Sequence, residues 1–164
     1  MTALVPPNHE AALALWRHYV DTHPDVPSIP EPAVEQFGDS PQLADDLLAL
    51  ILRRTKRATA GLVADYETAG EPVPGVGGHC VVCDSAGRPQ CVTRTVDVRT
   101  GPLDSVDAAF AWDEGEGDRT RESWLAEHER FFRGRLNSLG LPWSRDVDVV
   151  FERFEVVWPQ DVAE

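Results

Sequence analysis

A lysine and a threonine three residues apart, Lys56 and Thr59, are the residues of this sequence best suited to chemistry. Lys56 is the only lysine, and every other basic side chain apart from histidine is arginine. A lysine ammonium is a point charge whose pKa can be shifted, whereas an arginine guanidinium stays charged. One position that retains an amine in an arginine-rich chain indicates a special role there. The alternative is that Lys56 is an ordinary solvated side chain.

Thr59 is expected to lie at the start of a short helix over about residues 60–68, where unpaired backbone N–H groups point outward. An amine, a hydroxyl and free amides that converge would bind a carbonyl or phosphate oxygen. They would also suit nucleophilic catalysis, with Thr59 as the nucleophile and Lys56 as its activator. The alternative is that Thr59 only caps the helix.

Two glutamates in an acidic, glycine-bearing loop over residues 113–118, Glu114 and Glu116, are further catalytic candidates. The neighbouring glycines let the backbone bend, so that a carboxylate can be aimed into a cleft. A carboxylate near Lys56 could shuttle protons or position a substrate amide. The alternative is a solvated acidic loop, which is the commoner fate of such a run.

Histidine and cysteine side chains give a weaker signal. The stretch His79-Cys80-x-x-Cys83, followed by Cys91, resembles a zinc site in its spacing. Residues i and i+3 of a strand point to opposite faces, however, and no second pair of ligands follows at a suitable distance. We therefore expect buried cysteines, and we predict no metal and no other cofactor. His128 lies on an apolar helical stripe and is expected to support the site from the edge of the core.

The elements that would position these residues follow from apolar periodicity and from helix-capping signals. The helix that begins at Ser40-Pro41 is expected to deliver the chain directly into the stretch that contains Lys56. The other predicted elements are helices capped by Asn8, by Asp104 or Ser105 and by Thr120, and strands over residues 79–84, 90–99 and 147–158. Together they predict an α+β fold: a small β-sheet or β-barrel with several packed helices.

The length of 164 residues predicts one domain over residues 1–164. Residues 1–36 would supply an N-terminal helix and a Pro-rich extended connector, and residues 37–158 the core. No stretch approaches the roughly 18 apolar residues that span a membrane, and we see no signal peptide, so a cytoplasmic location is expected. Three cysteines do not suggest a disulfide framework.

The net charge of −13 argues against binding of long nucleic acids, because proteins that follow a phosphate backbone are normally basic. A small local basic patch does exist, and it coincides with the stretch around Lys56: Arg53, Arg54, Lys56 and Arg57. The partners that the composition allows are therefore a small nucleoside-like ligand or a short RNA. A protein-interaction module is a further class that the acidic surface permits.

Several motifs, taken together, resemble the ASCH-domain family, in particular a bacterial branch of it. The motifs are Phe37-Gly38-Asp39-Ser40-Pro41, Thr55-Lys56-Arg57-Ala58-Thr59, Glu114-Gly115-Glu116-Gly117-Asp118 and Trp124…His128…Phe131-Phe132. The resemblance covers about residues 11–158. The sequence departs from the family motif Gly-x-Lys-x-x-Thr at the first position, where Arg54 replaces the glycine. Glycine permits a turn that arginine resists, so this substitution bears on the loop conformation.

The resemblance implies a PUA-like β-barrel and a choice of activities. One type of ASCH protein is an amidohydrolase that acts on N4-acetylcytidine through the lysine and threonine of the motif and a later glutamate. These residues map onto Lys56, Thr59 and Glu116, with Glu114 as the alternative glutamate. Other ASCH proteins imply a non-catalytic module that binds RNA or a modified nucleotide, or a metal-dependent ribonuclease. The ligand-binding residues expected beside the catalytic ones are Arg54, Arg57, Arg94 and Trp112.

Overall fold

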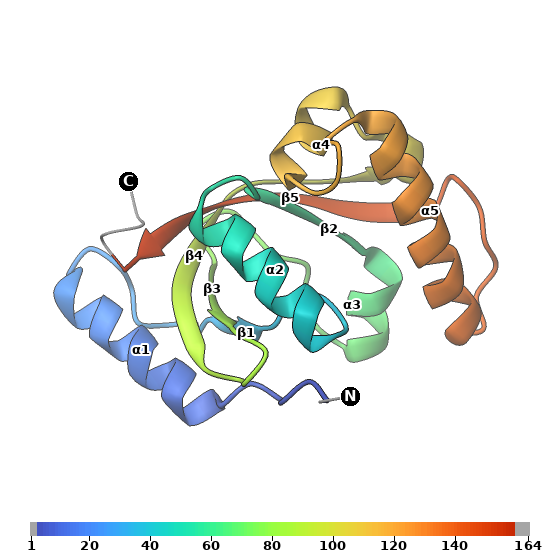
Figure 1. Ribbon diagram of the computed structural model, residues 1–164. Coiled ribbons are helices and arrows are strands. Elements are labelled where there is room, and N and C mark those ends of the chain that lie inside the picture. Colours follow the sequence, from blue (N-terminus) through green and yellow to red (C-terminus); the bar gives the residue numbers. More distant parts are fainter. Residues whose placement is uncertain (1–2, 160–164) are drawn as a thin grey trace. The chain divides into compact units, whose positions relative to one another are not determined.

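The computed structural model describes residues 3–159. These residues form five α-helices and five strands, which confirms the predicted α+β class (Figure 1). The helices are α1 (His9–Thr22), α2 (Pro41–Leu52), α3 (Val63–Ala69), α4 (Ala108–Glu114) and α5 (Arg121–Ser138). The strands are β1 (Ala33–Glu35), β2 (Ala58–Leu62), β3 (His79–Cys83), β4 (Pro89–Pro102) and β5 (Asp148–Trp158).

The strands form one mixed sheet in the order β1-β3-β4-β5-β2. Strand β1 pairs with β3 in parallel, whereas the pairs β3–β4 and β2–β5 are antiparallel. The chain divides into two compact units, and β4 and β5 are long enough to contribute to both. Of the described residues, the first unit contains 3–54, 77–95 and 154–159, and the second contains 55–76 and 96–153.

The first unit contains helices α1 and α2, both of which begin at the predicted caps. The Oδ1 atom of Asn8 accepts a hydrogen bond from the N–H of Ala11, and Ser40 with Pro41 begins α2. Each helix buries an apolar stripe against strand residues of the same unit, in two separate clusters.

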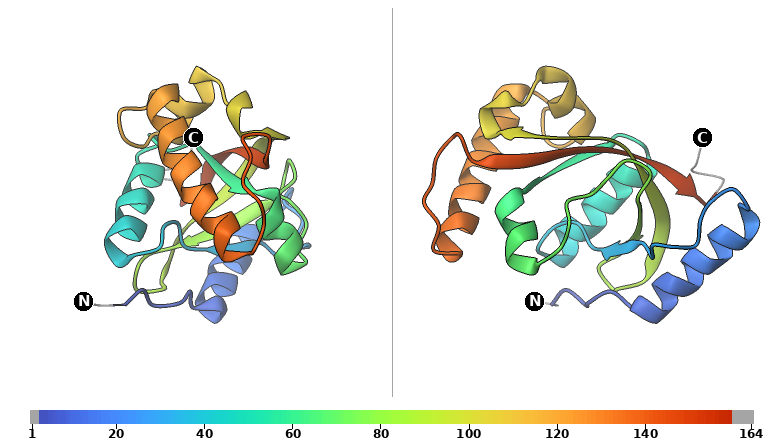
Figure 2. Two further views of the ribbon diagram at one scale, coloured as in Figure 1. Left: turned by 90° about the vertical axis from the view of Figure 1, so that its right-hand side faces the viewer. Right: turned by 180° about the vertical axis from the view of Figure 1, so that it is seen from behind.

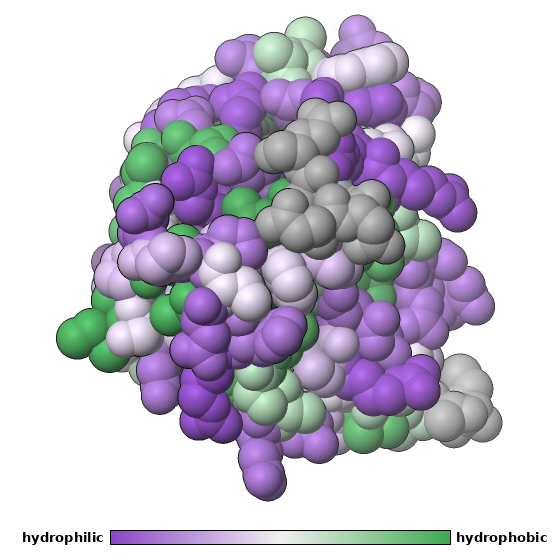
Figure 3. Space-filling view, turned by 90° about the vertical axis from the view of Figure 1, so that its left-hand side faces the viewer, coloured by the Kyte–Doolittle hydropathy of each residue, from purple (hydrophilic) through white to green (hydrophobic). Residues whose placement is uncertain are grey.

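On the face of the molecule seen in Figure 3, hydrophilic residues predominate and hydrophobic residues occur in small groups.

The cysteines of the first unit are all free thiols. Cys83 and Cys91 are buried, as expected, whereas Cys80 is half-buried. Burial, with Asp84 nearby, raises the pKa of the Cys83 thiol to about 11. Burial also raises the pKa of the Cys91 thiol to about 12. Thiols with such high pKa values stay protonated and unreactive near neutral pH. Within residues 3–159, no group of three or more histidine, cysteine or acidic residues could hold a metal ion.

The second unit is built on the antiparallel pair β2–β5, which lie side by side in each view of Figure 2. Ala58 and Leu62 of β2 are buried with Phe110, Trp124 and Phe151 in the core of this unit. Here the prediction of a helix from about residue 60, with Thr59 at its start, is wrong. Strand β2 pairs residue by residue with β5, and this tertiary pairing outweighs the local helical pattern. The helix begins only at Val63.

Helix α4 also differs from the prediction. Its cap is Asp107, whose carboxylate accepts a hydrogen bond from the N–H of Phe110; Leu103–Ser105 forms a short 3₁₀ turn instead. The helix extends to Glu114, whereas the sequence predicts this residue in the acidic loop. Gly115 ends it in the left-handed conformation, with φ of 74°. One candidate glutamate therefore lies on a helix and the other, Glu116, on the loop that follows.

Arg54 adopts the left-handed backbone conformation, with φ of 63°, directly after the C-cap of α2. Its N–H donates to the carbonyl of Ile51 at 3.0 Å. Glycine is the usual residue at this position after a helix. The arginine at the motif's glycine position thus takes up the conformation that glycine favours, at a cost of about 1–2 kcal/mol for an L-residue.

We expect the free energy of unfolding to be higher for Arg54→Gly than for Arg54→Ala, by about 1 kcal/mol. Both variants lose the arginine side chain, so the difference between them reports the backbone alone. At Arg53, which has φ of −84°, the order should be reversed, because glycine weakens a helix end in the right-handed region. Urea denaturation of the four variants measures both differences. Equal stabilities of Arg54→Gly and Arg54→Ala would contradict the assigned conformation.

Candidate active site

The ammonium group of Lys56 is buried inside the second unit, with 2% of the residue exposed. Its Nζ donates hydrogen bonds to the carbonyl of Ala58 at 2.8 Å and to Oε2 of Glu116 at 2.8 Å. The carbonyl of Glu114 lies 3.4 Å from Nζ, and Oε2 of Glu114 lies 3.9 Å from it. A buried ammonium needs such acceptors, because leaving water costs several kcal/mol per charge, about 5 or more when unpaired. Lys56 is therefore not a solvated side chain.

Backbone contacts hold the end of α4 against the stretch that contains Lys56. The N–H of Arg57 donates to the carbonyl of Asp113 at 2.7 Å. A Cβ atom added to Gly115 would collide with the carbonyl of Thr55 and with the Cα atom of Lys56. Glycine is thus required at this position for two reasons, its positive φ and the close backbone approach. This contact brings both glutamates within reach of one ammonium.

The two glutamates differ in their access to solvent. Glu114 is 2% exposed, whereas the side chain of Glu116 is 33% exposed. Oε2 of Glu114 lies 3.5 Å from Nε2 of His128 and 3.9 Å from Lys56, and within the described residues it accepts no hydrogen bond. Glu116 is thus the member of this cluster that a dissolved molecule can reach.

The pKa values of the two carboxyl groups move in opposite directions. Burial would raise the pKa of Glu114, but the charge of Lys56 and the interaction with His128 outweigh it and lower the pKa to about 2. Burial raises the pKa of Glu116; Lys56 opposes this effect, and the neighbouring Glu114 carboxylate adds to it. Glu114 therefore stays ionised, whereas Glu116 is the carboxyl group that more readily takes up a proton.

His128 connects this cluster to the core. Its Nδ1 lies 2.9 Å from the carbonyl of Trp124, and its ring stacks on the Trp124 ring with centroids 3.8 Å apart. An Nδ1–H that donates to this carbonyl leaves Nε2 directed at Glu114. Burial lowers the pKa of His128, but its 3.5 Å contact with the Glu114 carboxylate and the charge of that carboxylate outweigh burial, so that the pKa is raised.

Thr59 follows directly on the peptide group whose carbonyl accepts from Lys56. Its side chain is half-buried on β2 and has no hydrogen-bond partner within the described residues. The free helix-end amides that we expected around Thr59 are absent, because the residue lies in a strand paired with β5. What remains of the predicted arrangement is an unengaged hydroxyl one residue from the acceptor of a buried ammonium.

The predicted ligand-binding residues have different environments. Arg57 forms an ion pair with Asp113 at 2.7 Å, and Trp112 is 53% exposed. Arg54 and Arg94 belong to the first unit, where Arg94 forms an ion pair with Glu155 at 2.9 Å. A role of these two arginines in ligand binding stays a prediction. Sequence reasoning missed Arg119, whose guanidinium carbon lies 3.6 Å from the centroid of the Trp112 ring.

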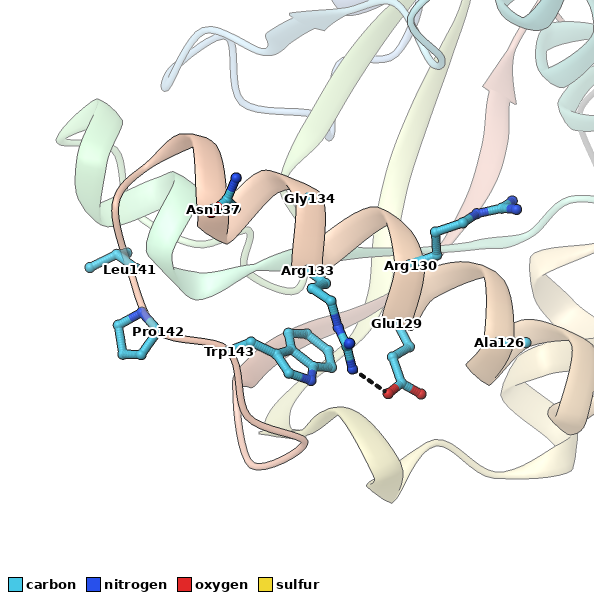
Figure 4. A pocket seen from close by; sticks show the side chains of 9 residues that line it. All are labelled: Ala126, Glu129, Arg130, Arg133, Gly134, Asn137, Leu141, Pro142 and Trp143. Atoms are coloured by element: carbon cyan, nitrogen blue, oxygen red, sulfur yellow. Dashed lines mark hydrogen bonds and ion pairs between the residues drawn. The ribbon is translucent and has the colours of Figure 1, made fainter.

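A groove of about 930 Å³ lies along α5 and the segment that follows it (Figure 4). In it, Arg133 lies between the carboxylate of Glu129, at 3.1 Å, and the ring of Trp143, whose centroid is 5.1 Å away. None of the predicted site residues lines the groove, which is formed by Ala126, Glu129, Arg130, Arg133, Gly134, Asn137, Leu141, Pro142 and Trp143. It is therefore a feature separate from the Lys56 cluster.

Comparisons with known proteins agree with the motif resemblance. A sequence model of the ASCH domain matches residues 33–158. The fold is similar to that of protein EF3133 from Enterococcus faecalis V583, of family DUF984, with a TM-score of 0.81 and 29% identity over 91% of this chain and 89% of the other. It is also similar to an ASCH domain from Lactobacillus crispatus JV V101, with a TM-score of 0.78 and 27% identity over 94% and 96% of the two chains. No curated protein matches the sequence. The PUA-like α+β prediction is thereby confirmed.

Replacement of Lys56 by methionine should lower the free energy of unfolding by about 3–5 kcal/mol, because it leaves the Glu114 carboxylate buried without its partner. Adding Glu114→Gln should restore part of this loss. The control is Arg57→Met, which removes an ion pair of a side chain that is 49% exposed and should cost about 1 kcal/mol or less. Chemical denaturation measures all four proteins. A Lys56→Met variant as stable as Arg57→Met would contradict the buried network.

His128 should make stability depend on pH in a defined direction. Its pKa in the folded protein is raised above 6.5, so the folded state binds more protons than the unfolded state. The stabilisation is fully present below pH 6.5 and is lost as pH rises through the folded pKa. The stability difference between wild type and His128→Gln should therefore shrink from pH 6 towards alkaline pH. Denaturation at several pH values measures this difference. The control is the His9→Gln variant, because His9 is exposed. A stability difference that grows with pH would contradict the raised pKa of His128.

Proposed function

The chain belongs to the ASCH domain family, and on this basis we propose that it is an amidohydrolase that removes an acyl group from N4 of a cytidine-type base. The observation that carries the proposal is the 2.8 Å contact between the buried ammonium of Lys56 and Glu116, the cluster's solvent-accessible carboxyl group. A buried ammonium that contacts a partly exposed carboxyl group is suited to support proton transfer by that carboxyl group during amide cleavage. In this proposal Thr59, the residue after the Ala58 carbonyl that accepts from Lys56, supplies the hydroxyl.

The proposed reaction has two steps. In the first, Oγ1 of Thr59 attacks the acyl carbon, and its proton passes to the carboxylate of Glu116. The carbon–nitrogen bond then breaks as Glu116 returns this proton to the leaving nitrogen, which releases the free amino base and leaves an acyl ester on Thr59. In the second step, water hydrolyses the ester, the carboxylic acid leaves, and the hydroxyl is restored.

Lys56 serves this reaction as an ammonium and not as a base. Its Nζ donates to a carbonyl and a carboxylate, contacts that fit the charged form. A neutral lysine would have to give up this arrangement before it could accept a proton. We therefore assign the proton transfer to Glu116, which departs from the initial expectation that Lys56 activates Thr59. The ionised Glu114 lies 3.9 Å from the ammonium, and in this proposal the ammonium stabilises negative charge that develops nearby.

The charges around the site favour a small ligand over a strand of RNA. Arg57 and Arg153 both contact the carboxylate of Asp113, at 2.7 and 2.9 Å, and Arg153 also contacts Asp97 at 3.3 Å. Arginines already paired with carboxylates offer little net charge to a phosphate backbone. Binding of the substrate should accordingly depend only weakly on salt, in contrast to phosphate-driven binding.

The test is hydrolysis of N4-acetylcytidine by wild type and by Thr59→Val, Glu116→Gln and Lys56→Met. Thr59→Val keeps the shape of the side chain and removes the nucleophile, and we expect a loss of about a thousandfold or more in kcat. Glu116→Gln should lose about a hundredfold or more. Thr59→Ser restores a hydroxyl and should retain activity, and exposed Glu122→Gln is the control for loss of a carboxylate. Wild-type activity that survives in Thr59→Val and Glu116→Gln would refute the assigned roles.

A further inference from the structure

Arg119 has a backbone conformation that an arginine adopts only under constraint. Its φ is 64°, in the left-handed region that favours glycine. A non-glycine residue there costs about 1 kcal/mol or more, and such residues cluster at functional sites. Arg119 lies in the loop that joins α4 to α5, three residues after Glu116.

The side-chain contacts of Arg119 explain why the strain is tolerated. Its Nε donates to the carbonyl of Trp112 at 2.8 Å, and Nη2 lies 3.5 Å from the carbonyl of Thr55. Its guanidinium carbon lies 3.6 Å from the centroid of the Trp112 ring, which is a close cation–π contact. One side chain thus fixes the Trp112 ring and links α4 to the residue that precedes Lys56.

Trp112 is 53% exposed even though Arg119 lies against its ring. An indole held in place while much of its surface meets solvent is a rigid, flat surface on which another ring can stack. It is two residues before Glu114 on α4, and the same short segment of chain carries Glu116. The stacking surface and the proposed proton-transfer group are therefore built on residues 112–119.

We infer that Trp112 binds the planar heteroaromatic ring of the substrate by stacking, and that Arg119 is a positioning residue that holds this ring relative to Glu116. The inference rests on the proposed function for the identity of the bond that is cleaved. To the proposed function it adds the kind of amine that carries the acyl group: the protein binds acylated aminoheteroaromatic rings and does not bind acylated aliphatic amines. Stacking tolerates different bases, because every base presents a flat π face. Recognition should therefore extend to acylated aminopyridines as well as cytidine.

The experiment measures equilibrium binding of cytidine, the unacylated product, by calorimetry, so that no catalysis is needed. We expect Trp112→Leu to weaken cytidine binding about tenfold or more, and Trp112→Phe to stay within about threefold of wild type. The control is Phe131→Leu, which removes an exposed aromatic ring (59% exposed) from α5 and should leave binding unchanged. Should Trp112→Leu fail to fold, the shift of the Trp112 indole N–H signal of wild type on adding cytidine reports the same contact.

For Arg119, kinetics and stability are compared in Arg119→Lys and Arg119→Gly. Glycine relieves the backbone strain, so Arg119→Gly should unfold no more easily than wild type, yet its KM for N4-acetylcytidine should rise about tenfold with a smaller change in kcat. Arg119→Lys keeps a cation over the indole and should recover part of the KM effect. An unchanged KM in Arg119→Gly would refute the positioning role.

The outcomes separate this inference from the proposed function. Cytidine binding that depends on Trp112, without hydrolysis of any acylated base, would support the stacking surface and refute the amidohydrolase. If Trp112→Leu hydrolyses N4-acetylcytidine as fast as wild type, this would support the amidohydrolase and refute the stacking surface. Equal cleavage of N-acetylcyclohexylamine and N-acetylaminopyridine, or no cytidine binding by wild type, would also refute the stacking surface.

Discussion

The second unit depends on the burial of one ammonium group. A charged Lys56 inside a protein is costly unless acceptors surround it, and here they come from β2, from the last residue of α4 and from the loop beyond it. The arrangement fixes where α4 must end and why Gly115 must lie against Thr55. It also places a second buried charge, Glu114, beside His128. The same few side chains therefore hold the backbone of this unit together and form the candidate site.

The two glutamates show how one helix end gives two carboxylates different properties. Glu114 is the last residue of α4 and is shielded from water, and the positive charge of Lys56 beside it keeps it ionised. Glu116, two residues later, is past the turn at Gly115 and partly in solvent. Burial makes the ionisation of Glu116 less favourable, and so does the Glu114 anion with which it shares the ammonium. Environments that separate two pKa values in this way are typical of acid–base pairs in enzymes.

Much of the fold, and most residues of the candidate site, could be predicted from the sequence. The lone lysine, the acidic loop with its glycines and the caps at Asn8, Ser40 and Thr120 are local signals, and each has a local physical cause. The α+β class followed from periodicity. Only the family resemblance favoured Glu116 over Glu114. The residues themselves did not separate the two, because one carboxylate lies on a helix end and the other on a loop, and the boundary depends on packing.

Other features depended on contacts distant in sequence. Thr59 was placed at a helix start because the residues after it favour a helix locally, but pairing of β2 with β5 decides its conformation. The left-handed conformation of Arg119 and its contact with Trp112 had no local signal, since neither glycine nor asparagine marks the position. The left-handed conformation of Arg54, in contrast, did have a local signal, because this residue occupies a motif position where glycine is usual.

The burial of Lys56 has a consequence for the chemistry of the protein's exterior. Since this is the chain's single lysine, no lysine amino group is displayed on the outside. Reagents and enzymes that acylate, cross-link or conjugate lysine side chains find none accessible in the folded protein. The positive charge that arginine supplies at the surface does not titrate in any ordinary buffer. An enzyme that forms acyl esters would thus carry no lysine nucleophile on its surface to intercept them.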